Sequence, residues 1–385
     1  MQLSGNWHYP TPIRFGAGRI AELADACRTL GIARPLLVTD RGLADLPITA
    51  AALAVLERGG LGAAMFGGVD SNPNEHNLEA GLRAYAEGRH DGVIGFGGGS
   101  ALDLGKTIAF MAGQDRPVWD FEDVDDGWTR ANAGAIAPII AVPTTAGTGS
   151  EVGRAAVLTR VEGGASMHEK KIIFHPKMLP GLVIADPELS VGMPGWVTAG
   201  TGMDAFAHCL EAWCSPHYHP MSQGIALEGM QLVNEWLPVA HADGTNLEAR
   251  AHLLAAAAMG ATAFQKGLGA IHALSHPIGA VHGTHHGTTN AVVMQPVLDF
   301  NRPAIEERMR AAARYLGIDG GFDGFRARVG ELNAGLGIPA TLGALGVVDP
   351  DLDALSAAAL RDPSVGGNPV AMTPDNTRAL FRACL

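Results

Sequence analysis

The stretch HALSHPIGAVHGTHHG, residues 272–287, is rich in imidazole groups. The chain has 15 histidines, and a third of them lie here: His272, His276, His282, His285 and His286. The first two are four residues apart, the spacing that places two side chains on one face of a helix. Imidazole is a common ligand for iron and zinc, so the stretch is a candidate metal site. The competing interpretation is a polar loop that merely tolerates histidine.

The motif GMDAFAHCLEAW supplies a second pair at the same spacing, Asp204 and His208, in a strongly helical stretch. The neighbouring positions are apolar, so we expect both side chains to point inward or into a cleft, where polar groups need partners. One carboxylate and two or three imidazoles from separate helices suit a divalent metal of the Fe²⁺ or Zn²⁺ type. A buried polar network without a metal is the alternative.

The segment GVIGFGGGSALDLGK runs from an apolar strand through Gly97, Gly98, Gly99 and Ser100 into a helix. Glycine lets a phosphate approach the backbone, and the N-terminus of the helix adds unpaired N–H donors. The spacing is not GxGxxG, so a plain tight turn explains this segment equally well.

A second loop, PTTAGTGSE, also follows an apolar strand and carries the hydroxyls of Thr144, Thr145, Thr148 and Ser150. These hydroxyls could bind ribose or phosphate, or could form an N-cap cluster. Open α/β sheets bind ligands at the carboxyl ends of their strands, which favours a nucleotide site. Asp40, at the end of the strand LLVTD, could accept both ribose hydroxyls of NAD and would repel the 2′-phosphate of NADP. Otherwise Asp40 only shapes a turn.

The elements that must position these residues follow from the hydrophobic periodicity. In the first half, apolar runs such as PLLVTD and APIIAVPTT alternate with helical patterns that end in glycine, which predicts βαβ units and a mostly parallel sheet. After DPELS, strand-like runs nearly vanish and helical spacing dominates. The sequence therefore predicts an α/β domain over residues 1–188 and an all-helical domain over residues 189–385.

Composition excludes several classes of protein. The chain has 385 residues, of which 47% are apolar, and a net charge of −12, which argues against nucleic acid or an anionic membrane as a partner. The sequence contains no run of about eighteen apolar residues, so we expect no transmembrane helix. It also shows no apparent secretory signal. The four cysteines show no CxxC pairing, which favours a cytoplasmic location.

Together the motifs resemble those of the iron-containing (group III) alcohol dehydrogenase family. The resemblance rests on VTD, GGGSALDLGK, PTTAGTGSE, LPGLVIADPEL, GMDAFAHCLEAW and GLGAIHALSHPIGA followed by THHGTTNAVV, in this order over nearly the whole chain. It implies a Rossmann-like parallel-sheet domain and a helical metal-binding domain, as in dehydroquinate synthase-like folds. It also implies a metal-dependent, NAD-linked alcohol dehydrogenase or aldehyde reductase.

The resemblance assigns roles to the matching histidines. It implies four metal ligands: Asp204, His208, His272 and His286. Fe²⁺ is the expected ion and Zn²⁺ the alternative. His276, the second histidine of the HxxxHPxG pattern, is implied to be a catalytic proton relay. His282 and His285 take no role from the family and are expected to be polar loop residues.

The resemblance also implies the cofactor contacts, which are Asp40, Gly97, Gly98, Gly99, Ser100, Asp103, Thr144, Thr145, Thr148 and Lys170. Lys171 is a close competitor for the position of Lys170. We expect NAD rather than NADP because of the charge of Asp40.

The expected reaction is the reversible oxidation of a small primary alcohol. The metal lowers the pKa of the alcohol, hydride passes to the nicotinamide, and His276 passes the proton out. Lys266 and Arg154 would favour an anionic substrate if both reached it, but we expect Lys266 to extend its charge to solvent. The family further implies a homo-oligomer, a dimer or larger.

Two alternatives compete with this function. The first is another enzyme of the same superfamily, a glycerol dehydrogenase or a dehydroquinate synthase-like lyase; the chain lacks the lysine- and arginine-rich cleft expected for a phosphorylated sugar acid. The second is a non-catalytic module that binds metal and nucleotide without turnover.

Overall fold

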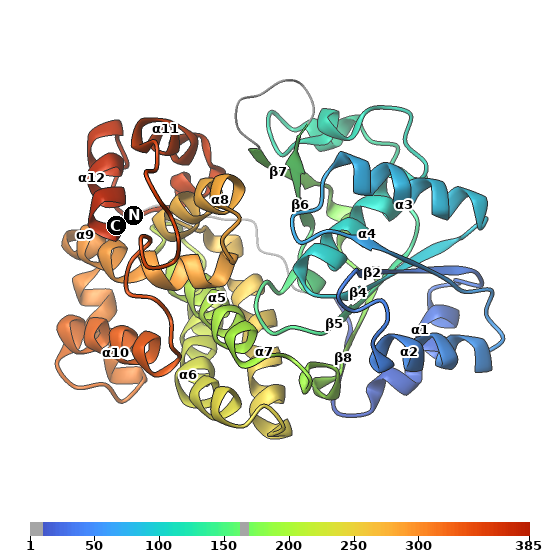
Figure 1. Ribbon diagram of the computed structural model, residues 1–385, viewed down its shortest axis with the longest axis horizontal. Coiled ribbons are helices and arrows are strands. Elements are labelled where there is room, and N and C mark those ends of the chain that lie inside the picture. Colours follow the sequence, from blue (N-terminus) through green and yellow to red (C-terminus); the bar gives the residue numbers. More distant parts are fainter. Residues whose placement is uncertain (1–10, 162–168) are drawn as a thin grey trace. The chain divides into compact units, whose positions relative to one another are not determined.

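The computed structural model describes residues 11–161 and 169–385, and the chain divides into two compact units (Figure 1). One unit contains the sheet, extends to Thr145 and resumes over Gly149–Val191. The other comprises Gly192–Leu385 and the short segment Ala146–Thr148. The loop PTTAGTGSE therefore contributes to both units, which hydrophobic periodicity does not reveal.

The first unit is built on a six-stranded sheet in the order β1-β8-β5-β4-β2-β3, with every neighbouring pair parallel. Its strands are Ile13–Phe15 (β1), Pro35–Asp40 (β2), Ala64–Val69 (β3), Gly92–Gly97 (β4), Ile139–Pro143 (β5) and Leu182–Ala185 (β8). The predicted parallel sheet is confirmed.

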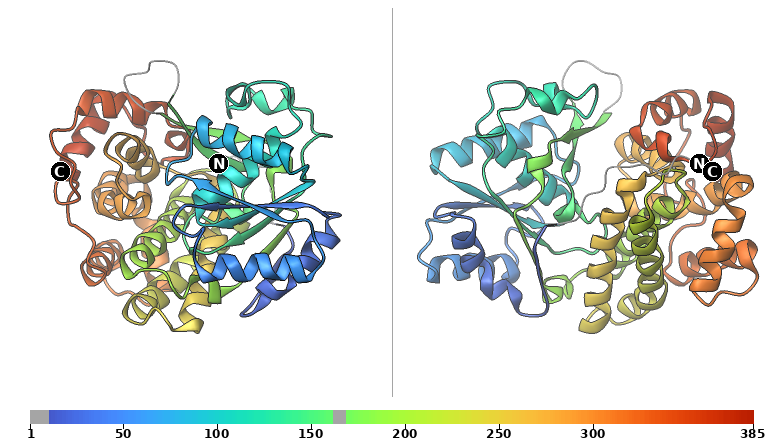
Figure 2. Two further views of the ribbon diagram at one scale, coloured as in Figure 1. Left: turned by 45° about the vertical axis from the view of Figure 1, so that its right-hand side comes forward. Right: turned by 180° about the vertical axis from the view of Figure 1, so that it is seen from behind.

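Alternation along the buried strands creates a core on each face of this sheet. Leu36 and Val38 of β2 join one buried cluster, whereas Leu37 between them joins the other. The first cluster is covered by Glu75–Glu87 (α3) and Gly99–Met111 (α4), and the second by Leu23–Thr29 (α1) and Pro47–Arg58 (α2) (Figure 2). A sheet covered on both faces needs apolar residues at successive positions, which explains why its strands are continuous apolar runs.

Sequence periodicity did not predict the antiparallel pair Ala155–Arg160 (β6) and Glu169–Phe174 (β7). The lysines of EKKIIF conceal the second strand, because charged residues are uncommon in buried strands. β6 packs against α4, so the pair belongs to the same unit as the sheet.

The second unit is helical, and in the described chain after Val191 no strand occurs, as predicted. Its α-helices are Gly195–Cys214 (α5), Pro220–Ala242 (α6), Leu247–Ala263 (α7), Ala270–His282 (α8), His286–Tyr315 (α9), Gly321–Gly335 (α10), Leu352–Arg361 (α11) and Pro374–Cys384 (α12). Short 3-10 helices occur in both units. The sheet unit contains Arg19–Glu22 (η1), Val118–Phe121 (η2), Gly127–Arg130 (η3), Ser150–Val152 (η4), Pro176–Met178 (η5) and Pro187–Ser190 (η6), and the helical unit contains Phe264–Lys266 (η7) and Pro363–Gly367 (η8).

Helix α9 is much longer than the sequence pattern indicates. The pattern predicts a helix only for residues 304–317, because Pro296 and Pro303 interrupt the part of α9 that precedes residue 304, and proline is unfavourable inside a helix. The buried residues of α9 lie on both sides of these prolines, so packing maintains one continuous helix. Within the described residues, no helix has the length and apolarity needed to span a membrane.

Candidate active site

Helix α5 presents three polar side chains on one face. Asp204, His208 and Glu211 are spaced i, i+4 and i+7, so they lie along one side of the helix, and each is at most 6% exposed. The remaining buried residues of α5 are mostly apolar or small. A buried polar stripe on such a helix must find partners on other elements.

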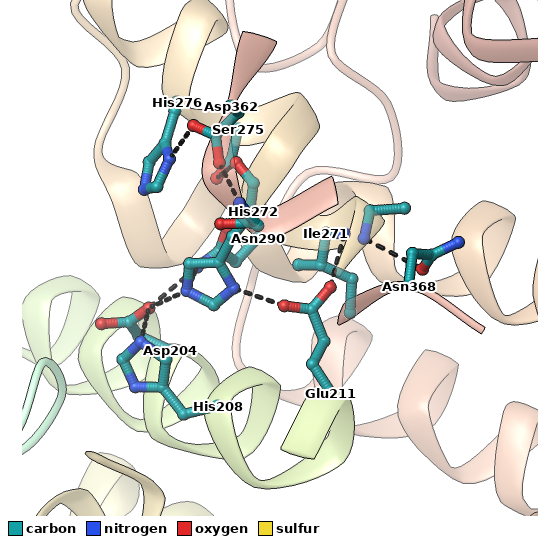
Figure 3. A network of polar contacts seen from close by, with 12 residues as sticks. Asp204, His208, Glu211, Ile271, His272, Ser275, His276, Asn290, Asp362 and Asn368 are labelled. Carbon is teal, nitrogen blue, oxygen red and sulfur yellow. Dashed lines mark hydrogen bonds and ion pairs between the residues drawn. The ribbon is translucent and has the colours of Figure 1, made fainter. Parts of the chain in front are cut away.

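Two neighbouring helices supply those partners, as Figure 3 shows for α8. His272 and His276 lie one turn apart on α8, and His286 is the first residue of α9. The Nε2 atoms of His208, His272 and His286 lie 3.8, 3.7 and 3.4 Å from Oδ1 of Asp204. The structure thus brings all four predicted metal ligands together around one carboxylate oxygen.

This geometry fits a metal ion. An ion with four ligands at about 2.0–2.2 Å holds their atoms roughly 3.3–3.6 Å apart, close to the observed separations. Asp204, His208 and His272 can each direct one ligand atom so that these atoms lie within 4.8 Å of one another. His286 lies next to this group, because its Nε2 is 3.4 Å from Oδ1 of Asp204.

The electrostatics of the cluster favour a cation. Burial works to raise the pKa of Asp204, but His208, His286 and His272 together hold it well below its usual range. Burial lowers the pKa of the His208 imidazole to about 4, so this ring is neutral and its Nε2 can act as a ligand. Burial opposes protonation of His272 as well, yet Glu211 and Asp204 raise its pKa to about 9. A metal ion would replace that proton.

Glu211 was not identified from the sequence. Its Oε2 lies 2.6 Å from Nδ1 of His272, and its Oε1 accepts a hydrogen bond of 2.6 Å from the backbone N–H of Ile271. Its i+7 position after Asp204 was the available signal. Asn290 was missed too: its Nδ2 donates to Oδ1 of Asp204 at 2.8 Å and lies 3.3 and 3.2 Å from the Nε2 atoms of His272 and His286.

His276 lies beside the cluster. Its ring stacks on that of His286, with centroids 5.3 Å apart. Its Nδ1 lies 2.6 Å from Oδ2 of Asp362, which precedes η8 and also accepts from the backbone N–H of Ser364 at 2.8 Å. Burial raises the pKa of Asp362, but His276 outweighs this effect and lowers it to about 2. The resulting His–Asp pair can hold one proton in a fixed orientation.

In the sheet unit, half of the predicted cofactor contacts meet at the carboxyl ends of β2, β4 and β5. Gly97 has φ of 145°, which glycine alone adopts readily, and a Cβ placed there would lie 3.3 Å from Oδ2 of Asp40. The backbone N–H of Thr144 donates to the carbonyl of Gly97, and a Cβ at Gly98 would lie 3.3 Å from Thr145. Close backbone approach and unpaired N–H groups at the start of α4 make this region suitable for a dinucleotide phosphate.

The remaining predicted contacts lie on α4, in the loop after β5 and on β7. The first turn of α4 contains Gly99 and Ser100, and the Ser100 hydroxyl donates to the Ser71 carbonyl at 2.7 Å. Thr148 is grouped with the helical unit. Lys170 of β7 pairs in register with Thr159 of β6. Its competitor Lys171 forms ion pairs with Glu122 and Glu169.

The carboxylate of Asp103, another predicted cofactor contact, already interacts with other groups of the protein. Its carboxylate accepts from the Ser150 hydroxyl and from the backbone N–H of Val157, and it lies 3.2 Å from Nζ of the buried Lys106. These contacts anchor the loop that follows β5 to α4.

Comparison with known proteins settles the family. The model of the family described as iron-containing alcohol dehydrogenase matches residues 10–187, and the model of its C-terminal domain matches residues 198–385. The chain belongs to the iron-containing alcohol dehydrogenase family.

Individual relatives agree along the whole length. A 4-hydroxybutyrate dehydrogenase of Cupriavidus necator is 38% identical over 94% of this chain and 95% of its own. The crystal structure of a 1,3-propanediol oxidoreductase is 33% identical, with a TM-score of 0.93 over 99% of both chains. A sulfoacetaldehyde reductase of Bifidobacterium kashiwanohense, solved in complex with NAD⁺, is 28% identical, with a TM-score of 0.87 over 99% of both chains. The predicted class, an oxidoreductase that acts on alcohol CH–OH groups, is confirmed, and the predicted cofactors, NAD and iron, agree with these relatives.

For Lys266 of this dehydrogenase, the expectation of a solvent-exposed charge was wrong. The side chain is 2% exposed, and Nζ donates to the carbonyls of Ala212, Trp213 and Ser215 at 2.8, 3.2 and 2.6 Å. Burial lowers its pKa to about 7. The ammonium group satisfies carbonyls at the C-terminal end of α5, which have no partner inside the helix.

The other candidate cation is also engaged. The Arg154 guanidinium lies 5.4 Å from the ring centroid of Phe174, and burial lowers its pKa while nearby Asp123 opposes this shift. The condition for an anionic substrate, that both Lys266 and Arg154 reach it, is therefore not supported by these contacts. His285 also differs from a simple loop residue, because it is the N-cap of α9 and accepts from the Thr288 N–H.

Proposed function

We propose that this protein is an iron-dependent, NAD-linked dehydrogenase that interconverts a short primary alcohol and its aldehyde. The observation that carries the proposal is the convergence of three imidazole Nε2 atoms on Oδ1 of Asp204, at 3.4–3.8 Å, in a chain of this family. In this proposal Asp204, His208, His272 and His286 hold the metal. The bound ion supplies Lewis-acid polarisation of the substrate oxygen.

The chain's own residues perform the remaining tasks. His276, oriented by Asp362, accepts the hydroxyl proton of the alcohol and passes it toward solvent. The turn at Gly97 and Gly98 admits the pyrophosphate of NAD to the N-terminus of α4. The free oxygen of Asp40 accepts from the adenosine ribose. Bound NAD⁺ would supply the hydride acceptor: the alcohol would lose its hydroxyl proton to His276 and a hydride, with two electrons, from its carbon to the nicotinamide, which gives the aldehyde and NADH.

The metal assignment is tested by His272→Ala and His286→Ala. Each removes one of four ligands, so we expect both variants to lose bound metal and turnover, while the dissociation constant for NAD changes less than about threefold. His282→Ala is the matched control, a histidine on α8 outside the cluster, and should retain metal. Metal content measured by atomic absorption decides the question, and wild-type stoichiometry in both ligand variants would refute the assignment.

A second substrate class, 4-hydroxy acids, is favoured by the relative that is 38% identical. The engagement of Lys266 and Arg154 with protein groups favours a neutral alcohol instead. The two substrates 1,4-butanediol and 4-hydroxybutyrate have the same carbon chain and differ in a carboxylate. We expect kcat/KM to be higher for the diol, and a clear preference for the acid would reverse this choice.

We also propose a cytoplasmic, homo-oligomeric enzyme. The four buried, unpaired cysteines support a reducing compartment. Light scattering after size exclusion should give a mass at least twice the 39.9 kDa of one chain.

A further inference from the structure

We propose that Glu211 is a positioning residue that keeps the His272 ring in the tautomer with its proton on Nδ1, so that Nε2 is available to the metal. The inference rests on the proposed role of His272 as a ligand. It concerns a residue on α5 that contacts the ring from the side opposite to Asp204 (Figure 3).

The hydrogen bonds around Glu211 leave one arrangement. The backbone N–H of Ile271 can only donate, and it occupies Oε1 at 2.6 Å. Oε2 lies 2.6 Å from Nδ1 of His272, and a carboxylate can only accept, so the proton must lie on Nδ1. In the neutral ring Nε2 then carries the lone pair, and this atom faces Oδ1 of Asp204 at 3.7 Å.

Both carboxylate oxygens of Glu211 thus accept hydrogen bonds from protein groups, the Ile271 N–H and the His272 ring, and neither is available to a metal ion. Glu211 is 6% exposed and His272 is 1% exposed, so water does not compete for Nδ1. Carboxylates that accept from the second nitrogen of a metal-bound histidine fix its orientation and raise its basicity.

Capping α8 does not by itself explain a buried charge at this position. The neighbouring N–H of Ala270, in the same first turn, is satisfied by a neutral amide, Oδ1 of Asn368 at 3.1 Å. Asn368 in turn exchanges two hydrogen bonds of 2.9 Å with Asn301. A neutral acceptor therefore suffices for the backbone, and the charge of Glu211 is required by the imidazole.

The variant Glu211→Gln tests this role at constant size. Its NH₂ group must face either Nδ1 of His272, where it donates and moves the ring proton to Nε2, or the N–H of Ile271, where two donors oppose each other. Asn368→Ala is the matched control, because it removes the other acceptor from the same turn without touching His272. The probe is Co²⁺ alone, added to metal-free protein and followed by its visible absorption.

We expect the Co²⁺ dissociation constant of Glu211→Gln to rise about ten- to a hundredfold. Asn368→Ala should lower the urea midpoint but change the Co²⁺ dissociation constant by less than about threefold. Wild-type affinity in Glu211→Gln would overturn the inference, and so would an equal loss in Asn368→Ala, since the role would then be structural. Failure of the wild type to bind Co²⁺ would instead refute the proposed function.

A measurement on the unmodified enzyme applies even if Glu211→Gln does not fold. In Zn²⁺-loaded protein labelled with ¹³C,¹⁵N-histidine, the ring of His272 is identified by through-bond correlation with its own backbone amide. We expect its Nδ1 to carry the proton. An unprotonated Nδ1 would overturn the inference.

Discussion

The two carboxylate oxygens of Asp40 have different surroundings. Oδ1 accepts from the backbone N–H groups of Gly42 and Leu43 at 2.9 and 3.0 Å, so the residue does shape the turn after β2. Oδ2 faces the glycine at the end of β4. The turn and the ribose interpretations are therefore compatible, and a variant that keeps the turn can separate them.

Asp40→Asn retains an oxygen that accepts in the turn but removes the charge. A 2′-phosphate next to an ionised carboxylate in a partly desolvated site costs a few kcal/mol, and each 1.4 kcal/mol is about tenfold. We expect the ratio of kcat/KM for NADP to that for NAD to rise by about tenfold or more. If both cofactors lose efficiency alike, Asp40 is only a turn residue.

His276 differs from its neighbour His272 in what its removal should do. His276→Ala should retain bound metal, because its ring stacks on that of His286 and its Nδ1 pairs with Asp362 rather than with the four proposed ligands. We expect kcat to fall by about 10²–10⁴, with part of the loss recovered at high pH, where hydroxide replaces the relay. Metal content and a pH profile of kcat measure both effects. Loss of metal would make His276 a ligand.

At the scale of elements, the loop after β5 is fastened to α4 by buried charges. Lys106 on α4 donates to the carbonyls of Ser150 and Ala155 and pairs with Asp103. Glu151, in η4, is 3% exposed. Burial raises its pKa from 4.5 to about 7, although Lys106 partly opposes the shift.

This pKa gives a pH-dependent prediction. The folded state holds the Glu151 proton more tightly than the unfolded state, so folding is penalised increasingly as the pH rises from 4.5 to about 7. Above this window the penalty is constant. Glu151→Gln removes it, so the variant should gain about 1–3 kcal/mol relative to the wild type at pH 8 and nothing at pH 4.5. Urea unfolding at both pH values measures the difference, and a pH-independent difference would contradict the assignment.

At the scale of the molecule, the proposed function gives the two units separate ligands, NAD for the sheet unit and the metal for the helical unit. Ligand binding stabilises the part of a protein that holds the ligand. Removal of the metal by a chelator should therefore increase amide hydrogen exchange in α5, α8 and the start of α9. Addition of NAD should protect the β4–α4 turn. Equal changes in both units after chelation would show that metal binding controls the stability of the whole chain.

The sequence alone determined much of this molecule because its signals are local. A spacing of four residues placed Asp204 with His208 and His272 with His276, since positions i and i+4 share a helix face. Apolar runs likewise predicted five strands of the six-stranded sheet, all except the short edge strand β1. Charged or proline-containing segments, such as β7 and the part of α9 before residue 304, were not predicted, because their local composition opposes the element that tertiary packing maintains.

Only the tertiary structure decided which distant groups meet. Glu211 contacts His272 across 61 positions of the chain, and His276 contacts Asp362 across 86; periodicity within one element contains no information about such pairs. The burial of Lys266 also depends on distant groups. Its neighbours in the sequence suggest an exposed position, because lysine is rarely fully buried. Three carbonyls at the end of another helix instead make its burial favourable. Local patterns determined which residues share a face, and packing between helices determined what that face contacts.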